Sequence, residues 1–115
     1  MDVEVAFTGI AVSGIAAAQA FYDRFFGRRP DIVASDAEVM WRLTDSAWLY
    51  VLVDHARAGS CLVTMAGEDL DAALAELGVR SVAAEQVEEM DAGRKATLRD
   101  PDGNTLAIIE VFERD

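Results

Sequence analysis

The pattern of apolar and polar positions predicts a strand and then a helix at the start of the chain. Residues 3–12 form an apolar run typical of a strand. From about Gly14 to Phe26, apolar side chains recur on one face of a predicted helix, at Ile15, Ala18, Phe21, Tyr22, Phe25 and Phe26. Ser13 suits the N-cap of this helix, Gly27 suits its end, and Pro30 lies just beyond.

The same order recurs in the second half of the chain. Residues 60–65 predict another strand, and Gly67-Glu68-Asp69 opens a second helix with acidic residues where the helix dipole favours them. The apolar stripe of this helix comprises Leu70, Ala73, Leu74 and Leu77. Gly78 is expected to end it. Because a strand, a helix and a glycine recur at a nearly fixed offset, the chain is predicted to be a duplicated module.

Further strands follow each predicted helix. After the first helix they are a short strand near residues 32–34 and longer strands at 38–44 and 47–54. After the second helix they are a weak strand near 81–87 and stronger strands at 94–99 and 105–112. The acidic stretch 85–91 is expected to be solvated. Both halves thus have the order β-α-β-β-β, which predicts an α+β fold.

A tight turn separates the last two strands. In the run Asp100-Pro101-Asp102-Gly103-Asn104, Pro101 presets φ for the second turn position, Asp102 suits the third, and Gly103 tolerates a positive φ. The flanking runs are strand-like, so they are predicted to form a β-hairpin around this turn.

Composition narrows the classes of function. The 115 residues suffice for one domain, and 10 basic against 21 acidic residues give a net charge of −11. Such an acidic chain lacks the basic surface that nucleic acids and anionic membranes attract, so neither is an expected partner. The charge would attract a cationic small molecule, or it serves solubility alone. No run is long and apolar enough to span a membrane.

Cysteine use and the N-terminus indicate a cytoplasmic protein. Cys61 is the only cysteine, which rules out an intrachain disulfide and a thiolate zinc cluster. The opening residues Met1-Asp2-Val3-Glu4 lack the basic and long apolar regions of a signal peptide. Alternation along the strand turns Cys61 toward the helices, so a buried and inert thiol is expected.

Three motifs accompany the repeated order of elements. They are Phe21-Tyr22 followed by Phe26-Gly27, then Asp69-Leu70-Asp71, and finally Asp100-Pro101-Asp102-Gly103-Asn104. With these motifs and the repeat, nearly the whole chain resembles the vicinal oxygen chelate superfamily, which includes glyoxalase I, extradiol dioxygenases and bleomycin-resistance proteins.

The resemblance implies a single domain over residues 1–115, built of two βαβββ modules at about 1–56 and 57–115. Each module would form half of an open, curved mixed sheet. Together they would complete a cup with the helices outside and a ligand cavity inside. Small members of the superfamily usually pair, often with cavities at the shared interface, so a homodimer is expected.

Metal-dependent members of the superfamily place one ligand, usually His or Glu, on each of four strands facing the cup. Carried across by motif, these positions are Phe7, Ser60, Ala107 and either Tyr50 or Leu52. None of these side chains is an imidazole or a carboxylate, the groups that hold a divalent ion and leave room for substrate oxygens. His55, the only histidine, and Asp54 offer two ligands, too few for a tight site. No metal or other cofactor is therefore expected.

Strand alternation assigns the side chains that would line the cup. If Tyr50 points inward, so do Trp48 and Leu52, together with Phe7, Ser60, Thr64 and Ala107 on other strands. Strand 38–44 leaves two interpretations open, in which the inward set is either Val39, Trp41 and Leu43 or Glu38, Met40, Arg42 and Thr44. The aromatic side chains, with Trp41 among them in the first interpretation, suit a flat aromatic or cationic ligand. Alternatively, they form core or a dimer interface.

These observations favour a metal-independent protein of the bleomycin-resistance type, which would sequester a small aromatic or cationic compound, such as an antibiotic, without chemistry. Two alternatives remain. One is a metal-free isomerase or lyase that uses His55 or Glu110 as an acid or base, although His55 equally suits a plain surface position. The other is a non-catalytic dimerisation module.

Overall fold

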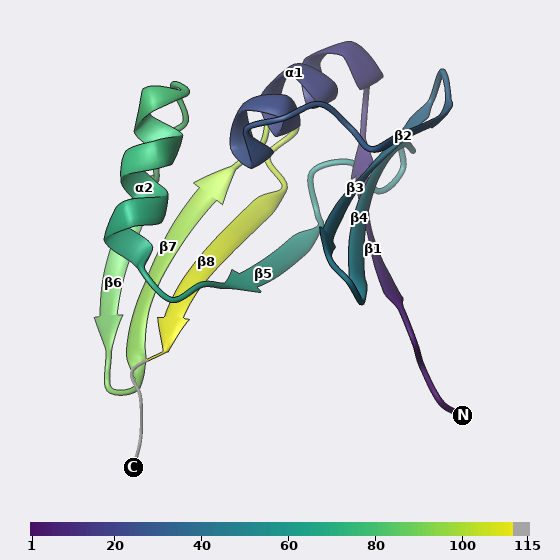
Figure 1. The fold of residues 1–115 in the computed structure, drawn as a ribbon. Coiled ribbons are helices and arrows are strands. Elements are labelled where there is room, and N and C mark those ends of the chain that lie inside the picture. Colours follow the sequence, from purple (N-terminus) through teal and green to yellow (C-terminus); the bar gives the residue numbers. More distant parts are fainter. Residues whose placement is uncertain (112–115) are drawn as a thin grey trace.

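The computed structural model describes residues 1–111, which form two four-stranded sheets and two helices (Figure 1). The first half comprises β1 (Ala6–Val12), α1 (Ile15–Phe26), β2 (Ile32–Ser35), β3 (Glu38–Thr44) and β4 (Ala47–Val53). The second half comprises β5 (Leu62–Ala66), α2 (Leu70–Val79), β6 (Gln86–Met90), β7 (Gly93–Arg99) and β8 (Thr105–Val111). The predicted β-α-β-β-β order is confirmed in both halves, and so is the α+β class.

The two sheets have the same strand order. They run β1-β4-β3-β2 and β5-β8-β7-β6, so each half of the chain forms one sheet. The pairs β1–β4 and β5–β8 are parallel and the other pairs are antiparallel, so both sheets are mixed. No ladder joins β1 to β5 within the described residues. Each of these strands therefore leaves one edge without a strand partner.

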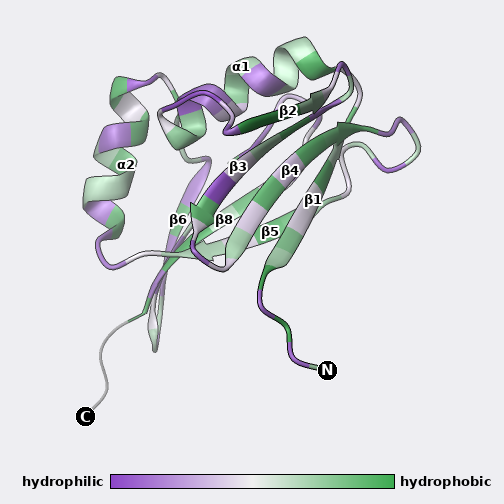
Figure 2. Ribbon diagram, turned by 45° about the vertical axis from the view of Figure 1, so that its right-hand side comes forward, coloured by the Kyte–Doolittle hydropathy of each residue, from purple (hydrophilic) through white to green (hydrophobic). Residues whose placement is uncertain are grey.

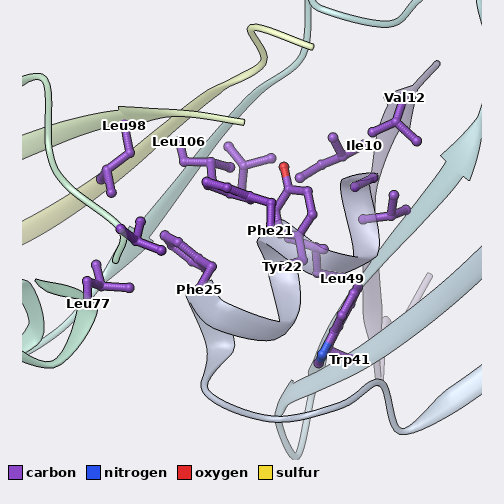
Figure 3. Packing of buried hydrophobic residues seen from close by; sticks show 14 of the residues in the cluster. Ile10, Val12, Phe21, Tyr22, Phe25, Trp41, Leu49, Leu77, Leu98 and Leu106 are labelled. Carbon is purple, nitrogen blue, oxygen red and sulfur yellow. The ribbon is translucent and has the colours of Figure 1, made fainter. Parts of the chain in front are cut away.

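Helix α1 packs against both sheets and so unites the core. Its buried face carries Ala18, Phe21, Tyr22 and Phe25. Figure 3 shows Phe25 and Phe21 beside Leu77, Leu98 and Leu106 of the second half, while Tyr22 lies toward Leu49 and Trp41 of the first. In Figure 2, hydrophobic and hydrophilic bands alternate along α1 and α2, as expected of helices that bury one face.

Buried polar groups join the last turn to the rest of the fold. Asn104 is fully buried, and its side-chain amide donates to the Ala11 carbonyl and to Asp100, both at 2.8 Å. Its side-chain oxygen accepts from the backbone N–H groups of Gly59 and Cys61, both at 2.9 Å. The turn itself has the expected form, because Gly103 has a φ of 91° and donates to the Asp100 carbonyl. One amide thus fixes the ends of β1, β5 and β8 relative to one another.

The ends of the helices differ from the sequence-based expectation. The N-cap of α1 is Gly14, without a side-chain cap, rather than Ser13. The backbone N–H of Ser13 instead donates to Asp102 of the β7–β8 turn at 3.0 Å, which supplies the negative charge favoured near a helix N-terminus. Gly27 ends α1 in the left-handed region, as predicted. Helix α2 continues past Gly78 to Val79, so that residue does not end it.

Strand β6 also differs from the expectation. A weak strand was expected near residues 81–87, but the strand lies at Gln86–Met90, within the stretch expected to be solvated. As an edge strand, β6 needs a ladder only with β7, and its acidic side chains stay accessible to water. The last residue of the predicted final strand, Phe112, lies outside the described residues. No helix among residues 1–111 combines the length and the apolar character that crossing a membrane requires.

Candidate functional site

Each sheet has one face covered by helices and an opposite face, here called the outer face. The outer face is the one that carries most of the side chains predicted to line the cup. In the first sheet, Ile10, Val39, Trp41, Leu49 and Val51 belong to the buried core under α1. Because side chains alternate along a strand, the outer face of this sheet carries the remaining set, which comprises Phe7, Gly9 and Ala11 on β1, Met40 and Arg42 on β3, and Trp48, Tyr50 and Leu52 on β4.

An aromatic platform, defined as Phe7, Trp48 and Tyr50, occupies this outer face. Phe7 and Trp48 are cross-strand neighbours whose rings stack at 5.9 Å between centroids, with 23° between their planes. Phe7 is 55% exposed, so the stacked pair remains open to solvent. Tyr50 lies opposite Gly9, and its ring covers that residue so closely that a Cβ on Gly9 would lie 2.6 Å from the ring. Glycine at this position therefore lets the tyrosine ring lie over β1.

Trp41 does not belong to this surface, so of the two interpretations left open for strand 38–44, the one that turned Trp41 toward the cup is wrong. It is fully buried on the helix side, with ring centroids 5.9 Å from Tyr22 and 5.3 Å from Phe26. Its indole N–H donates to the Arg28 carbonyl at 3.2 Å. The physical reason is the aromatic stripe of α1, which buries the apolar set of β3. The outer face of β3 therefore carries Met40 and Arg42.

In the second sheet, the predicted residues separate into two groups. Thr64 and Ala107 are partners in the β5–β8 ladder and share its outer face. Ser60 precedes β5, is exposed, and donates to the Arg57 carbonyl at 2.9 Å, so it does not occupy a strand position beside them. Cys61 packs against the core as expected, although it is only half-buried, and its sulfur accepts the Ala11 N–H at 3.4 Å.

A cavity of about 540 Å³ lies where the first sheet and β5 part, beside the end of α1. It brings together two predicted residues from different halves, Trp48 and Thr64. Trp48 also belongs to the aromatic platform, so the platform and the cavity share this residue. The other apolar residues of its wall could not be predicted, because strand spacing does not show where two sheets separate. They are Ala6, Phe26, Leu43, Ala47, Leu49, Val63, Met65 and Ala66.

A second, smaller cavity adjoins the first. It has a volume of about 250 Å³ and shares Phe26, Met65 and Ala66 with the larger one. Leu77 and Ala73 of α2 form its other side. The space beside the end of α1 therefore extends from the first sheet to α2.

Two ion pairs lie near the larger cavity. Arg28, in the cavity wall, pairs with Asp31 at 2.6 Å. Asp31 also accepts the backbone N–H of Arg42 at 2.7 Å, and these contacts, with the Arg28 hydrogen bond first, lower the pKa of the Asp31 carboxyl. The Arg42 side chain pairs with Asp45 at 3.1 Å in an exposed contact that salt screens readily.

The two candidate acid–base residues lie apart from the aromatic platform. His55 is exposed in the loop after β4. Glu110 lies on the helix side of the second sheet, where it pairs with Arg94 at 3.2 Å and accepts the Leu70 N–H at the start of α2 at 2.9 Å. Glu110 therefore binds the start of α2 and does not share the faces that carry the other predicted cup residues.

The positions that correspond to metal ligands do not fit a divalent ion. Phe7, Tyr50 and Ala107 lie on outer faces of the sheets, and Ser60 lies in the loop before β5. Phe7 and Ala107 have no side-chain atom that can bind a metal ion. Tyr50 and Ser60 offer neutral hydroxyls, which are poor metal ligands unaided. Over residues 1–111, no three His, Cys, Asp or Glu side chains gather in a metal-binding arrangement.

Comparison with known proteins identifies relatives through their solved structures. No family model matches the chain, and no curated protein matches it either. A glyoxalase/bleomycin resistance protein from Catenulispora acidiphila DSM 44928 is 35% identical, with a TM-score of 0.89 over 94% of this chain and 98% of that one.

Two more distant structures show the same fold. The antibiotic-binding protein TnmS3 from Streptomyces sp. CB03234 is 22% identical, with a TM-score of 0.74 over 94% of this chain and 95% of that one. A lactoylglutathione lyase from Agrobacterium tumefaciens is 19% identical, with a TM-score of 0.73 over 92% of each chain. The repeated sheets, the buried β7–β8 turn and the similarity to the Catenulispora protein agree: this chain belongs to the glyoxalase/bleomycin resistance proteins of the vicinal oxygen chelate superfamily.

Proposed function

We propose that this chain binds a small aromatic compound at the aromatic platform and the adjoining cavity, and sequesters it without a catalytic metal. The observation that carries the proposal is the stacked pair Phe7 and Trp48, in which Phe7 is 55% exposed and Trp48 belongs to the wall of a cavity of about 540 Å³. Ligand sites for small molecules usually have volumes of roughly 300–1,000 Å³ and mostly apolar walls. Both properties are present where the platform and the cavity meet.

Aromatic stacking and apolar burial would supply the binding energy. A favourable aromatic pair contributes about 0.5–1.5 kcal/mol beyond the area that it buries. The cavity wall adds Phe26, Leu49 and Met65 as apolar contacts and the hydroxyls of Thr8 and Thr64 as polar ones. The net charge of −11 favours a ligand that carries a positive charge, which a tryptophan face also attracts.

A sequestering role is supported by two observations. The residues at the four metal-ligand positions offer neither imidazole nor carboxylate, and Glu110 is already engaged by Arg94 and the start of α2. TnmS3, which has the same fold, is an antibiotic-binding protein. Binding without turnover requires neither metal ligands nor a free acid or base, so these side chains suffice for it.

We further propose that the chain forms a homodimer through the outer face of its second sheet. Leu62 is 70% and Val111 60% exposed on that face, apart from the aromatic platform. Exposed apolar groups of neighbouring strands are typical of protein–protein interfaces. Light scattering after size exclusion measures the mass directly. A monomer at high protein concentration contradicts the dimer and leaves the ligand proposal standing, because platform and cavity belong to one chain.

A thermal-shift screen of planar aromatic compounds, with and without a chelator, tests the binding function. The expected result is a set of compounds that raise the melting temperature equally in both conditions. Trp48→Ala should abolish the shift, whereas Val87→Ala, an exposed position on β6, should preserve it. Stabilisation by Ni²⁺, Zn²⁺ or Fe²⁺ but by no organic compound would overturn the proposal.

A further inference from the structure

The row of side chains that contains the stacked aromatic pair ends at a guanidinium group. In the ladders of the first sheet, Phe7 is paired with Trp48, and Trp48 is paired with Arg42. These three residues therefore lie side by side on the outer face, one from each of β1, β4 and β3. On the outer face of these three strands, the other charged side chain is Glu38, which lies two rows away beside Leu52. The strand residue that borders the stacked pair thus carries a positive charge.

The backbone of Arg42 is held by residues that lie outside β3. Its N–H donates to the Asp31 carboxylate at 2.7 Å, and its carbonyl accepts from the Arg28 side chain. Arg28 and Asp31 also form an ion pair with each other at 2.6 Å. The end of β3 that carries Arg42 is therefore fixed before a ligand arrives, which lowers the entropic cost of binding there.

The guanidinium of Arg42 has an exposed partner. It pairs with Asp45 at 3.1 Å, in the turn between β3 and β4. The Arg42 side chain is 51% exposed and the Asp45 side chain is fully exposed. Ion pairs between solvent-exposed groups contribute little to stability, so an anionic group of a ligand can take the place of Asp45.

We infer that Arg42 selects an aromatic ligand with an anionic substituent, such as a carboxylate, whose ring stacks on Phe7 and Trp48. The inference rests on the proposed function, because the ring has to bind at the aromatic platform. Cross-strand neighbours have Cβ atoms about 4.5–5.5 Å apart, so a substituent of a ring on Trp48 comes within reach of Arg42. A guanidinium binds a carboxylate through two parallel hydrogen bonds, and this contact also orients the ring.

This preference opposes the net charge of −11, which attracts cations over long distances. Salt screens such fields over about 8 Å at physiological ionic strength. The net charge is distributed over the whole chain, whereas Arg42 lies directly beside Trp48. At physiological salt, the neighbouring guanidinium therefore decides which charge a platform ligand carries.

Three compounds that share one ring system and differ in charge provide the test. They are naphthoate, the neutral naphthamide and protonated naphthylmethylamine. Isothermal titration calorimetry at physiological salt should show that naphthoate binds about tenfold more tightly than naphthamide, the difference expected for one hydrogen bond to a charged group. Naphthylmethylamine should bind most weakly of the three.

Substitutions at both ends of the exposed ion pair separate charge from structure. Arg42→Gln keeps the backbone contacts and should make naphthoate and naphthamide bind equally. Asp45→Asn removes the competing carboxylate and should strengthen naphthoate binding about threefold, with no change for naphthamide. A merely structural role of Arg42 predicts no such gain. The matched control is Arg57→Gln, which removes an exposed arginine from its ion pair with Asp54 after β4 and should leave all three affinities unchanged.

The outcomes distinguish this inference from the proposed function. If naphthoate and naphthamide bind the wild type equally and Trp48→Ala abolishes both, Arg42 selects nothing and the proposed function stands. If naphthylmethylamine binds most tightly, the net charge decides and the inference is again overturned. If none of the three compounds binds, the inference fails, and the proposed function fails with it when the thermal-shift screen also finds no organic ligand.

Discussion

The hydroxyl of Tyr22 donates a hydrogen bond of 2.8 Å to the carboxylate of Asp100, and both residues are buried. Tyr22 lies on α1 of the first half and Asp100 in the β7–β8 turn of the second, 78 residues apart. The same carboxylate accepts the backbone N–H groups of Asp102 and Asn104, both at 2.9 Å. The contact therefore joins the two halves through a charged group with a full set of partners.

Replacing Tyr22 with phenylalanine should destabilise the protein by about 2 kcal/mol. The substitution keeps the ring but leaves a buried carboxylate with one donor fewer, a loss typical of hydrogen bonds to charged groups. Urea unfolding followed by circular dichroism measures the change. Tyr50→Phe on the outer face is the matched control and should change stability by less than about 0.5 kcal/mol. Equal effects of both substitutions would show that the Asp100 contact contributes nothing.

Stability should also fall in alkaline solution because of Tyr22. Burial, and then the Asp100 charge, raise the pKa of the Tyr22 hydroxyl well above its usual range. In the unfolded chain this group loses its proton near pH 10, whereas the folded protein retains it. The unfolded state then binds fewer protons, so the free energy of unfolding decreases as the pH rises above about 10.

The control for this pH effect is again Tyr22→Phe. Other groups titrate in the same range, so the quantity to compare is the difference between wild type and variant. Urea unfolding at intervals from pH 8 to pH 11 should show the two proteins converging as the pH rises. Parallel curves would mean that the hydroxyl ionises with the same pKa in both states.

Asn104→Asp should be among the most damaging substitutions in the chain. The side-chain amide of Asn104 donates to the Ala11 carbonyl and to the Asp100 carboxylate, so a second carboxylate would face two acceptors in a buried site. A loss of more than about 3 kcal/mol is expected, the range found when a buried charge lacks a partner. Thermal unfolding checks the result. Asp102→Asn, a milder change in the same turn, should cost less than about 1 kcal/mol.

Gly9→Ala tests how the tyrosine of the aromatic platform is held. An added methyl group would lie 2.6 Å from the Tyr50 ring, whose outer end can rotate toward solvent. The cost in stability should stay near 1 kcal/mol, whereas binding of a platform ligand should weaken. In a Tyr50→Ala background the same substitution should cost almost nothing, which a double-mutant cycle measures. If Gly9→Ala costs the same stability in the Tyr50→Ala background, the added methyl group conflicts with a group other than the Tyr50 ring.

Residue patterns predicted the elements better than the surfaces between them. The repeated strand, helix and glycine gave the two-sheet order because each element carries its own periodicity, and Asp100–Asn104 gave the turn because proline and glycine restrict φ locally. Trp41 could not be assigned from β3 alone, since both of its faces contain apolar side chains. The stripe of α1 decides that assignment, and it comes from another part of the chain.

The candidate site was predicted only in part, because local patterns show which side chains share a face but not how distant elements meet. Phe7, Trp48 and Tyr50 share a face because strand alternation is local, and the structure brings them together. Ser60 was misplaced because β5 begins at Leu62, two residues later than expected. The cavity lies where β1 and β5 separate, away from the Asn104 contact with Ala11, and the pattern of neither strand alone shows that separation.

The packing of α1 against both sheets has a consequence for how this duplicated chain can evolve. Its buried face holds three aromatic residues of the core that both halves share, whereas α2 buries only Leu70 and Leu77. The second half alone would lose the aromatic side chains of α1 that lie beside Leu98 and Leu106, so it is not expected to fold without the first half. A crossover that exchanged one half for the other would produce two like halves that cannot share a core.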